Sequence, residues 1–103
     1  MAHTCKAKKI IKLHKSGMAD CQAGDLDSAV GKLKLALGEV RKIGLDGYQV
    51  KIMNNLGIVF EMKGDQRKAR GHYKAALAIA RHRFGKRARL YQVVNQNMAR
   101  VAP

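Results

Sequence analysis

The stretch NNLGIVFEMKGDQRKARGHYKAAL, residues 54–77, decides how this chain folds. Its apolar residues recur at intervals of three and four on both sides of a Gly-Asp pair, as they do along one face of an α-helix. Gly64 can end a first helix in the left-handed conformation, and the side chain of Asp65 can cap the start of a second. The stretch therefore predicts two antiparallel helices joined by a tight turn.

The same hairpin occurs earlier in the chain. When residues 10–43 are laid over residues 50–83, an offset of 40, nine of 34 positions are identical. The identical pairs are Gly17/Gly57, Gly24/Gly64, Asp25/Asp65, Ala29/Ala69, Gly31/Gly71, Lys34/Lys74, Ala36/Ala76, Leu37/Leu77 and Arg41/Arg81. A fixed period of this size is typical of stacked supersecondary units. We therefore expect two repeats over these two ranges, joined by a short turn at Gly44–Gly47.

One more helix is expected at residues 86–101, where Leu90, Met98 and Val101 can face the preceding hairpin. A stack of repeats needs a terminal element that covers its last apolar face. The sequence thus predicts a single all-α domain over residues 1–103, made of two helical hairpins and a C-terminal capping helix.

Two glycines and one tyrosine inside the repeats need an explanation. Gly31 and Gly71 fall within the second helix of each hairpin, where glycine costs about 1 kcal/mol relative to alanine. We expect close packing of helices to explain both glycines. Tyr73 is expected to be structural and to fill the space between the hairpins.

Both repeats resemble the tetratricopeptide repeat. The resemblance rests on Leu56, Gly57, Phe60, Gly64, Asp65, Ala69, Tyr73 and Ala76 in the second repeat, and on Gly17, Gly24, Asp25, Ala29, Leu33 and Ala36 in the first. The first repeat departs from the pattern at Ser16 and Asp20, where leucine and an aromatic residue are usual, and Arg41 and Arg81 stand where the family has proline. The 40-residue spacing and the Asn-Asn-Leu-Gly opening are most similar to the kinesin-light-chain-like variety. The resemblance implies a right-handed α-α superhelix.

The resemblance also implies a binding surface. In such arrays the first helix of each repeat lines a concave groove, and an asparagine at the position of Asn55 holds the backbone of an extended peptide. A side-chain amide suits this role because it offers one acceptor and two donors to a peptide unit. The candidate peptide-binding residues are Asn55, Asn54, Lys15, Lys51, His14 and Asn97. The alternative is that the asparagines are exposed polar residues on a solvated helix face.

The distribution of charge indicates an anionic partner. The net charge is +14, and all seven acidic residues lie between Asp20 and Asp65. Such a field attracts acidic peptides or nucleic acid. We therefore expect an acidic protein or peptide partner, bound by a non-catalytic adaptor. The runner-up is nucleic-acid or polyanion binding through Arg81, Arg83, Lys86, Arg87 and Arg89, although an aromatic content of 5% offers few platforms for base stacking. The basic surface can also serve solubility alone.

Other classes of function find little support in the sequence. It contains no Gly-rich phosphate loop and no evident catalytic triad, so we expect no enzyme and no cofactor. Cys5 and Cys21 lack the spacing of a metal site. No apolar run approaches the roughly 20 residues that span a bilayer, so we expect a cytoplasmic protein without a membrane role. Self-association through Ile10, Ile11 and Leu13 remains an alternative.

Overall fold

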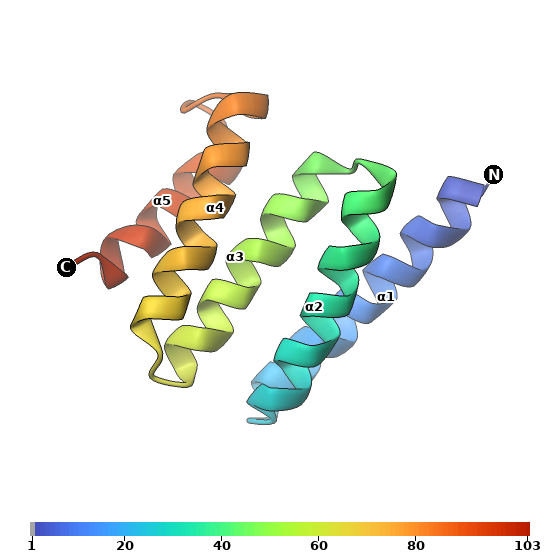
Figure 1. The fold of residues 1–103 in the computed structure, drawn as a ribbon, viewed down its shortest axis with the longest axis horizontal. Helices are drawn as coiled ribbons and strands as arrows, with labels where there is room; N and C mark the ends of the chain where they lie inside the picture. The colour runs from blue at the N-terminus through green and yellow to red at the C-terminus, as the bar shows by residue number, and fades with distance from the viewer. Residues whose placement is uncertain (1) are drawn as a thin grey trace.

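The structure, a computed structural model, describes residues 2–103, with side chains from Cys5 onward. The regular structure of these residues is entirely helical, and the five helices are labelled in Figure 1. They are α1 (Ala2–Gln22), α2 (Leu26–Ile43), α3 (Asp46–Met62), α4 (Gln66–Phe84) and α5 (Arg89–Val101). The expected all-α fold of two hairpins and a C-terminal helix is confirmed.

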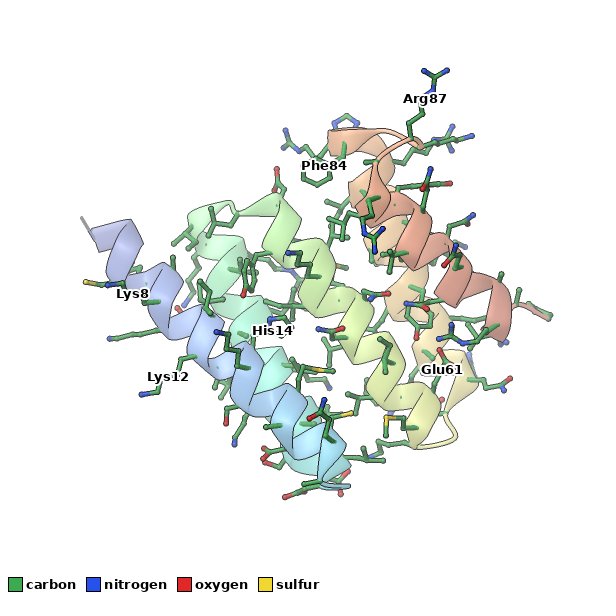
Figure 2. All side chains as sticks on the ribbon, turned by 180° about the vertical axis from the view of Figure 1, so that it is seen from behind. Lys8, Lys12, His14, Glu61, Phe84 and Arg87 are labelled. Atoms are coloured by element: carbon green, nitrogen blue, oxygen red, sulfur yellow. The ribbon has the colours of Figure 1, made fainter. Side chains whose placement is uncertain are left out.

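The helices form two layers. Helices α1 and α2 pack as one hairpin, α3 and α4 pack as the next, and α5 packs on α4 and α3. Helix α3 also contacts α1 and α2, whereas no Cα atom of α2 lies within 8 Å of a Cα atom of α4. Figure 1 shows α2 and α4 towards the viewer, and Figure 2 shows the other face with α1 and α5 in front. The molecule is therefore a slab of 44 × 33 × 17 Å, which is two helices thick.

The two predicted Gly-Asp turns are built alike. Gly24 and Gly64 have φ angles of +86° and +80°, which favour glycine because it lacks a Cβ. The carboxylate of Asp25 accepts a hydrogen bond from the Ser28 amide at 3.3 Å. That of Asp65 accepts one from the Lys68 amide at 3.0 Å. Each aspartate thus caps the helix that follows, as the sequence indicated.

The helix starts differ from the expected ones. Helix α1 begins at Ala2, well before residue 10, and α3 begins at Asp46, so that only Gly44 and Leu45 separate the hairpins. Gly44 ends α2 in the left-handed conformation, and its amide donates to the Val40 carbonyl. At the other end of the chain, Ala88 has extended backbone angles, which delays the start of α5 to Arg89.

Tyr73 is fully buried and structural, as expected. A Cβ placed on Gly57 would collide with the Tyr73 ring, so the ring packs directly on the α3 backbone. The ring packs within the second hairpin, and not between the hairpins as the sequence had suggested, and its hydroxyl donates to Glu61. The core around it is formed by residues from every helix, including Leu33, Val40, Ile52, Leu56, Val59, Val94 and Val101.

The expected packing role of Gly31 and Gly71 is wrong. Both glycines are exposed, and a Cβ added to either would meet no atom within 4 Å. They lie on the outer face of α2 and α4, where no described helix covers them. Ile10 is also unsuited to the self-association that the sequence suggested, because its side chain is only 2% exposed and belongs to the core.

Candidate peptide-binding groove

A hollow of about 500 Å³ lies between the first helices of the repeats and α5. Its lining comes from α1, α3 and α5, and consists of His14, Lys51, Asn54, Asn55, Arg89, Leu90 and Val93. Four of the six residues assigned to peptide binding from the sequence thus meet here: His14, Lys51, Asn54 and Asn55. We refer to this hollow as the concave groove, after the surface that the resemblance implied.

Asn55 and His14 bridge the groove from α3 to α1. The Asn55 Nδ2 atom lies 2.6 Å from His14 Nε2, and both side chains are half-buried. Burial, helped by the positive charge of Lys51, lowers the pKa of His14 below its ordinary value. A neutral imidazole can accept a hydrogen bond at Nε2, which matches the amide donor of Asn55. Figure 2 shows His14 on the side of α1 that faces α3.

The His14 ring also has an aromatic neighbour. The Tyr48 ring contacts it edge-on, with the centroids 5.4 Å apart. The Lys51 ammonium stands 5.7 Å from the Tyr48 centroid while its side chain remains exposed. The Asn55 carbonyl oxygen makes no hydrogen bond to the residues that the structure describes. One acceptor of the groove is therefore open to a ligand.

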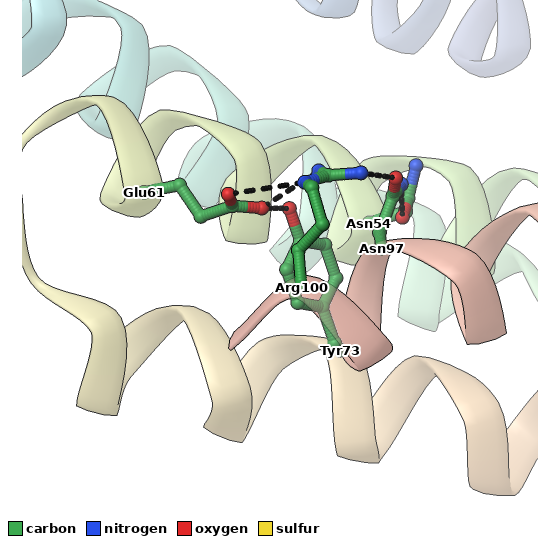
Figure 3. A network of polar contacts seen from close by, with 5 residues as sticks. All are labelled: Asn54, Glu61, Tyr73, Asn97 and Arg100. Atoms are coloured by element: carbon green, nitrogen blue, oxygen red, sulfur yellow. Dashed lines mark hydrogen bonds and ion pairs between the residues drawn. The ribbon is translucent and has the colours of Figure 1, made fainter. Parts of the chain in front are cut away.

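Asn54 is engaged differently from its neighbour. It is only 8% exposed, and its Oδ1 atom accepts a hydrogen bond of 2.8 Å from Asn97 Nδ2 on α5. Arg100 donates to Asn97 Oδ1 at 2.7 Å and to Glu61 Oε1 at 2.8 Å (Figure 3). The Glu61 carboxylate also accepts the Tyr73 hydroxyl. Asn54 and Asn97 thus belong to a network that attaches α5 to α3.

Two of the expected groove residues do not line the hollow. Lys15 is exposed on α1, outside the lining, and Asn97 faces Asn54. In their place α5 contributes Arg89 and Leu90, which the sequence had suggested for a polyanion surface and for helix packing. Both lie in the first turn of α5. The late start of this helix, which brings them to the groove, had no clear signal in the sequence.

The electrostatics of the concave groove are one-sided. Lys51 and Arg89 contribute the formal charges of its lining, and no acidic residue belongs to the lining. Neither cation forms an ion pair with a residue in the described part of the chain. The groove therefore combines amide groups, an apolar wall of Leu90 and Val93, and an uncompensated positive charge.

The basic residues proposed for polyanion binding cluster around the end of α4 and the turn before α5. All five are exposed, and Figure 2 shows Arg87 at this end of the slab beside Phe84. Arg83 is paired with Asp46 at 3.0 Å. Arg81, Lys86 and Arg87 have no such partner among residues 5–103. We refer to all five residues, Arg81, Arg83, Lys86, Arg87 and Arg89, as the basic end.

Residues 5–103 contain no group of three histidine, cysteine or carboxylate side chains placed to hold a metal ion. None of the helices within residues 2–103 has the length and apolarity of a bilayer-spanning segment.

Comparison with known proteins places the fold. The crystal structure of BtubC (BKLC) from P. vanneervenii superposes with a TM-score of 0.77 at 23% sequence identity. The match covers 86% of this chain but 36% of that one, so the chain spans about a third of its length. No curated protein matches the sequence. The sequence profile of the tetratricopeptide repeat matches residues 10–82, which include the first expected repeat and nearly all of the second. The resemblance to the tetratricopeptide repeat is confirmed by this match over most of the chain, and the chain belongs to the tetratricopeptide repeat family.

Proposed function

We propose that the chain is a non-catalytic adaptor that holds an extended, acidic peptide segment of a partner protein in the concave groove. Membership of the tetratricopeptide repeat family indicates a protein-protein interaction module. One observation carries the finer proposal: the half-buried amide of Asn55 shares a hollow without acidic residues with two uncompensated cations, Lys51 and Arg89. A peptide that brings its own carboxylates satisfies both features.

The amide of Asn55 binds the peptide backbone in this proposal. Its free carbonyl oxygen accepts an N–H of the peptide, and its NH₂ group keeps His14 as a partner or exchanges it for a peptide carbonyl. This contact does not depend on the side chains of the peptide. Lys51 and Arg89 then select for acidic side chains through charge-assisted hydrogen bonds.

We place the adaptor in the cytoplasm. Cys21 is buried and Cys5 is exposed, and both are free thiols, which suits a reducing compartment. The groove lining contains no serine, threonine, cysteine or carboxylate side chain, and we expect binding without turnover.

A pull-down from lysate of the source cells tests the proposal. Wild type, Asn55→Ala and Asn95→Ala are compared after nuclease treatment, with mass spectrometry as the readout. Asn95 is an exposed asparagine of α5 outside the groove, and so provides the matched control. We expect one protein to be retained by wild type and the control, and its affinity to fall about tenfold in Asn55→Ala, the effect of losing a buried hydrogen bond of about 1.4 kcal/mol. Equal retention by all three would exclude Asn55 as the anchor.

Binding of a polyanion is the second candidate, and it is favoured by the unpaired arginines and lysine of the basic end. Counterion release makes such binding fall steeply with salt. The double variant Lys86→Glu/Arg87→Glu should abolish retention of a nucleic-acid probe, whereas Asn55→Ala should leave it unchanged. Asn55→Ala and Lys86→Glu/Arg87→Glu therefore separate the two candidates.

A further inference from the structure

A second groove lies on the other face of the slab. The Cα atoms of α2 and α4 stay more than 8 Å apart, and the hollow between the two helices measures about 610 Å³. Met53 and Leu56 of α3 form its floor, and Figure 1 shows α3 running between the two flanking helices. This outer groove shares none of its lining residues with the concave groove. A ligand here would leave the concave groove accessible.

The walls of the outer groove are unusually open. Gly38 of α2 and Gly71 of α4 lie in its lining, and a Cβ on either would meet no atom within 4 Å. Glycine is disfavoured inside a helix, and neither glycine has a positive φ that would require it. The fold therefore gives no reason for these glycines. Another backbone could approach both walls closely. Gly31 is equally open but lies outside the groove, so the glycines alone do not define a site.

The charges of the outer groove give the second and independent observation. Its lining contains Lys34, Arg41 and Lys68 but no acidic residue. Lys34 and Arg41 form no ion pair with any residue that the structure describes, and Lys68 only approaches Asp65 at 3.9 Å. A groove that is cationic on both walls is complementary to an acidic occupant.

The spacing of the cations favours a helical occupant. Lys34 and Arg41 are seven residues apart on α2, which separates them by about 10.5 Å along the helix axis. A helix lying in the groove presents acidic residues at the same two-turn interval, and the glycines allow it to approach at ordinary interhelical distances of roughly 8–10 Å. We propose that the outer groove docks an amphipathic helix of a partner protein, with a narrow apolar face flanked by acidic side chains.

This inference goes beyond the function proposed above, because it concerns a different face and a different form of ligand. The concave groove would take an extended segment, and the outer groove a helix. The chain can then hold two segments at once.

Nuclear magnetic resonance of the uniformly ¹⁵N-labelled full chain tests the proposal. The probes are amphipathic helical peptides of about 18 residues, with leucine at i, i+3, i+4 and i+7 and glutamate on both flanks. Scrambled peptides of identical composition serve as controls. The backbone amides of Gly38 and Gly71 should shift and saturate with the helical probes, while those of Gly31 and Asn55 should not. The scrambled peptides should bind the outer groove at least tenfold more weakly, as judged from the shifts of Gly38 and Gly71.

Variants of the two glycines separate the groove from the fold. Gly38→Leu/Gly71→Leu fills the groove and replaces two poor helix formers, so it should lower the affinity at least tenfold without lowering the melting temperature. Gly31→Leu is the matched control and should bind as wild type does. Lys34→Glu/Arg41→Glu should lose binding and leave the circular dichroism spectrum unchanged.

Several results would overturn the proposal. The first is that no helical probe binds at the outer groove. The second is equal affinity for helical and scrambled peptides, which would mean simple charge attraction. A third is a shift centred on His14 and Asn55, which would place the peptide in the concave groove. The last is a concentration-dependent shift of Gly38 and Gly71 without peptide, which would mean that a second copy of the chain fills the groove.

Discussion

Single residues of the same type have opposite roles in this chain, as its glycines show. Gly57 lies beneath the Tyr73 ring and leaves no room for a methyl group, whereas Gly31 faces open space. The repeat alignment matched Gly57 with Gly17 and Gly31 with Gly71, and close helix packing was the expected role of Gly31 and Gly71. Sequence could not separate them, because the difference depends on whether another helix covers the position.

Gly57→Ala should therefore destabilise the fold. The added methyl group must displace the buried Tyr73 ring, at a cost of about 1–3 kcal/mol in the free energy of unfolding. Gly31→Ala is the control and should raise this free energy by about 0.5–1 kcal/mol, because alanine is the better helix former. Urea denaturation followed by circular dichroism measures both. An unchanged free energy of unfolding in Gly57→Ala would show that the Tyr73 ring can move aside without cost.

His14 should make stability depend on pH. Burial, and then the charge of Lys51, lowers its pKa from the ordinary value of 6.5. The unfolded chain then binds more protons than the folded chain below about pH 6.5, so acidification weakens the fold. The free energy of unfolding should fall between about pH 7 and 5.5, and fall less in His14→Gln, which keeps an acceptor for Asn55. Denaturation at several pH values measures this, and parallel curves for the two proteins would contradict it.

Asn54 and Asn55 show which features of the site could be predicted from the sequence and which could not. The amide chemistry and the four residues that meet in the groove followed from the sequence and its resemblance to the family. The different roles of the two asparagines could not be predicted. Adjacent helix positions point about 100° apart, and only the placement of α5 decides which asparagine is covered. Asn97, which holds Asn54, is 43 residues away.

At the scale of elements, the turns were predictable and the helix starts were not. Gly64 and Asp65 predict one turn, because glycine tolerates a positive φ and aspartate caps the following helix. Gly24 and Asp25 predict the other turn in the same way. Helix α3 is preceded by Leu45 and α5 by Ala88, and neither of these N-cap residues has a side chain that caps the helix. Without such signals the starts depend on tertiary packing, which places Arg89 at the concave groove.

Helix α5 should depend on Arg100 for its attachment. This side chain joins Asn97 to Glu61, and the Arg70 guanidinium adds a hydrogen bond of 3.0 Å to the Val101 carbonyl. Burial by itself would raise the pKa of Glu61, but the hydrogen bonds from Arg100 and Tyr73 and the charge of Arg100 together outweigh it. The pKa is therefore lowered, and the carboxylate stays charged. Arg100→Ala should destabilise α5 by about 0.5–1 kcal/mol, since the pair is partly exposed.

Native-state hydrogen exchange measures this effect. Amides of α5 should exchange about two to five times faster in Arg100→Ala, while those of α1 and α2 keep their rates. Arg83→Ala removes a comparable ion pair, with Asp46, at the opposite end of α4 and serves as the control. Unchanged exchange in α5 would mean that apolar packing through Val94 and Val101 is sufficient to hold it.

At the scale of the whole molecule, the net charge of +14 opposes compaction. Only six ion pairs are formed among the side chains of residues 5–103, and the acidic groups are concentrated in the middle of the sequence. Salt should therefore stabilise this protein, because it screens repulsion over roughly 8–10 Å at physiological ionic strength. The melting temperature should rise between about 20 and 200 mM sodium chloride. A falling melting temperature would show that the ion pairs outweigh the repulsion.

The central claim is that a partner segment lies in the concave groove, and site-specific photo-crosslinking tests it most directly. A photoreactive phenylalanine analogue replaces Val93 in the groove or, in a second protein, Arg87 at the basic end, and each protein is irradiated in nuclease-treated lysate. We predict that position 93 crosslinks an acidic segment of one protein, that the product is lost when Asn55→Ala is added, and that position 87 gives no such product. Crosslinks at position 87 alone, insensitive to Asn55→Ala, would contradict the claim.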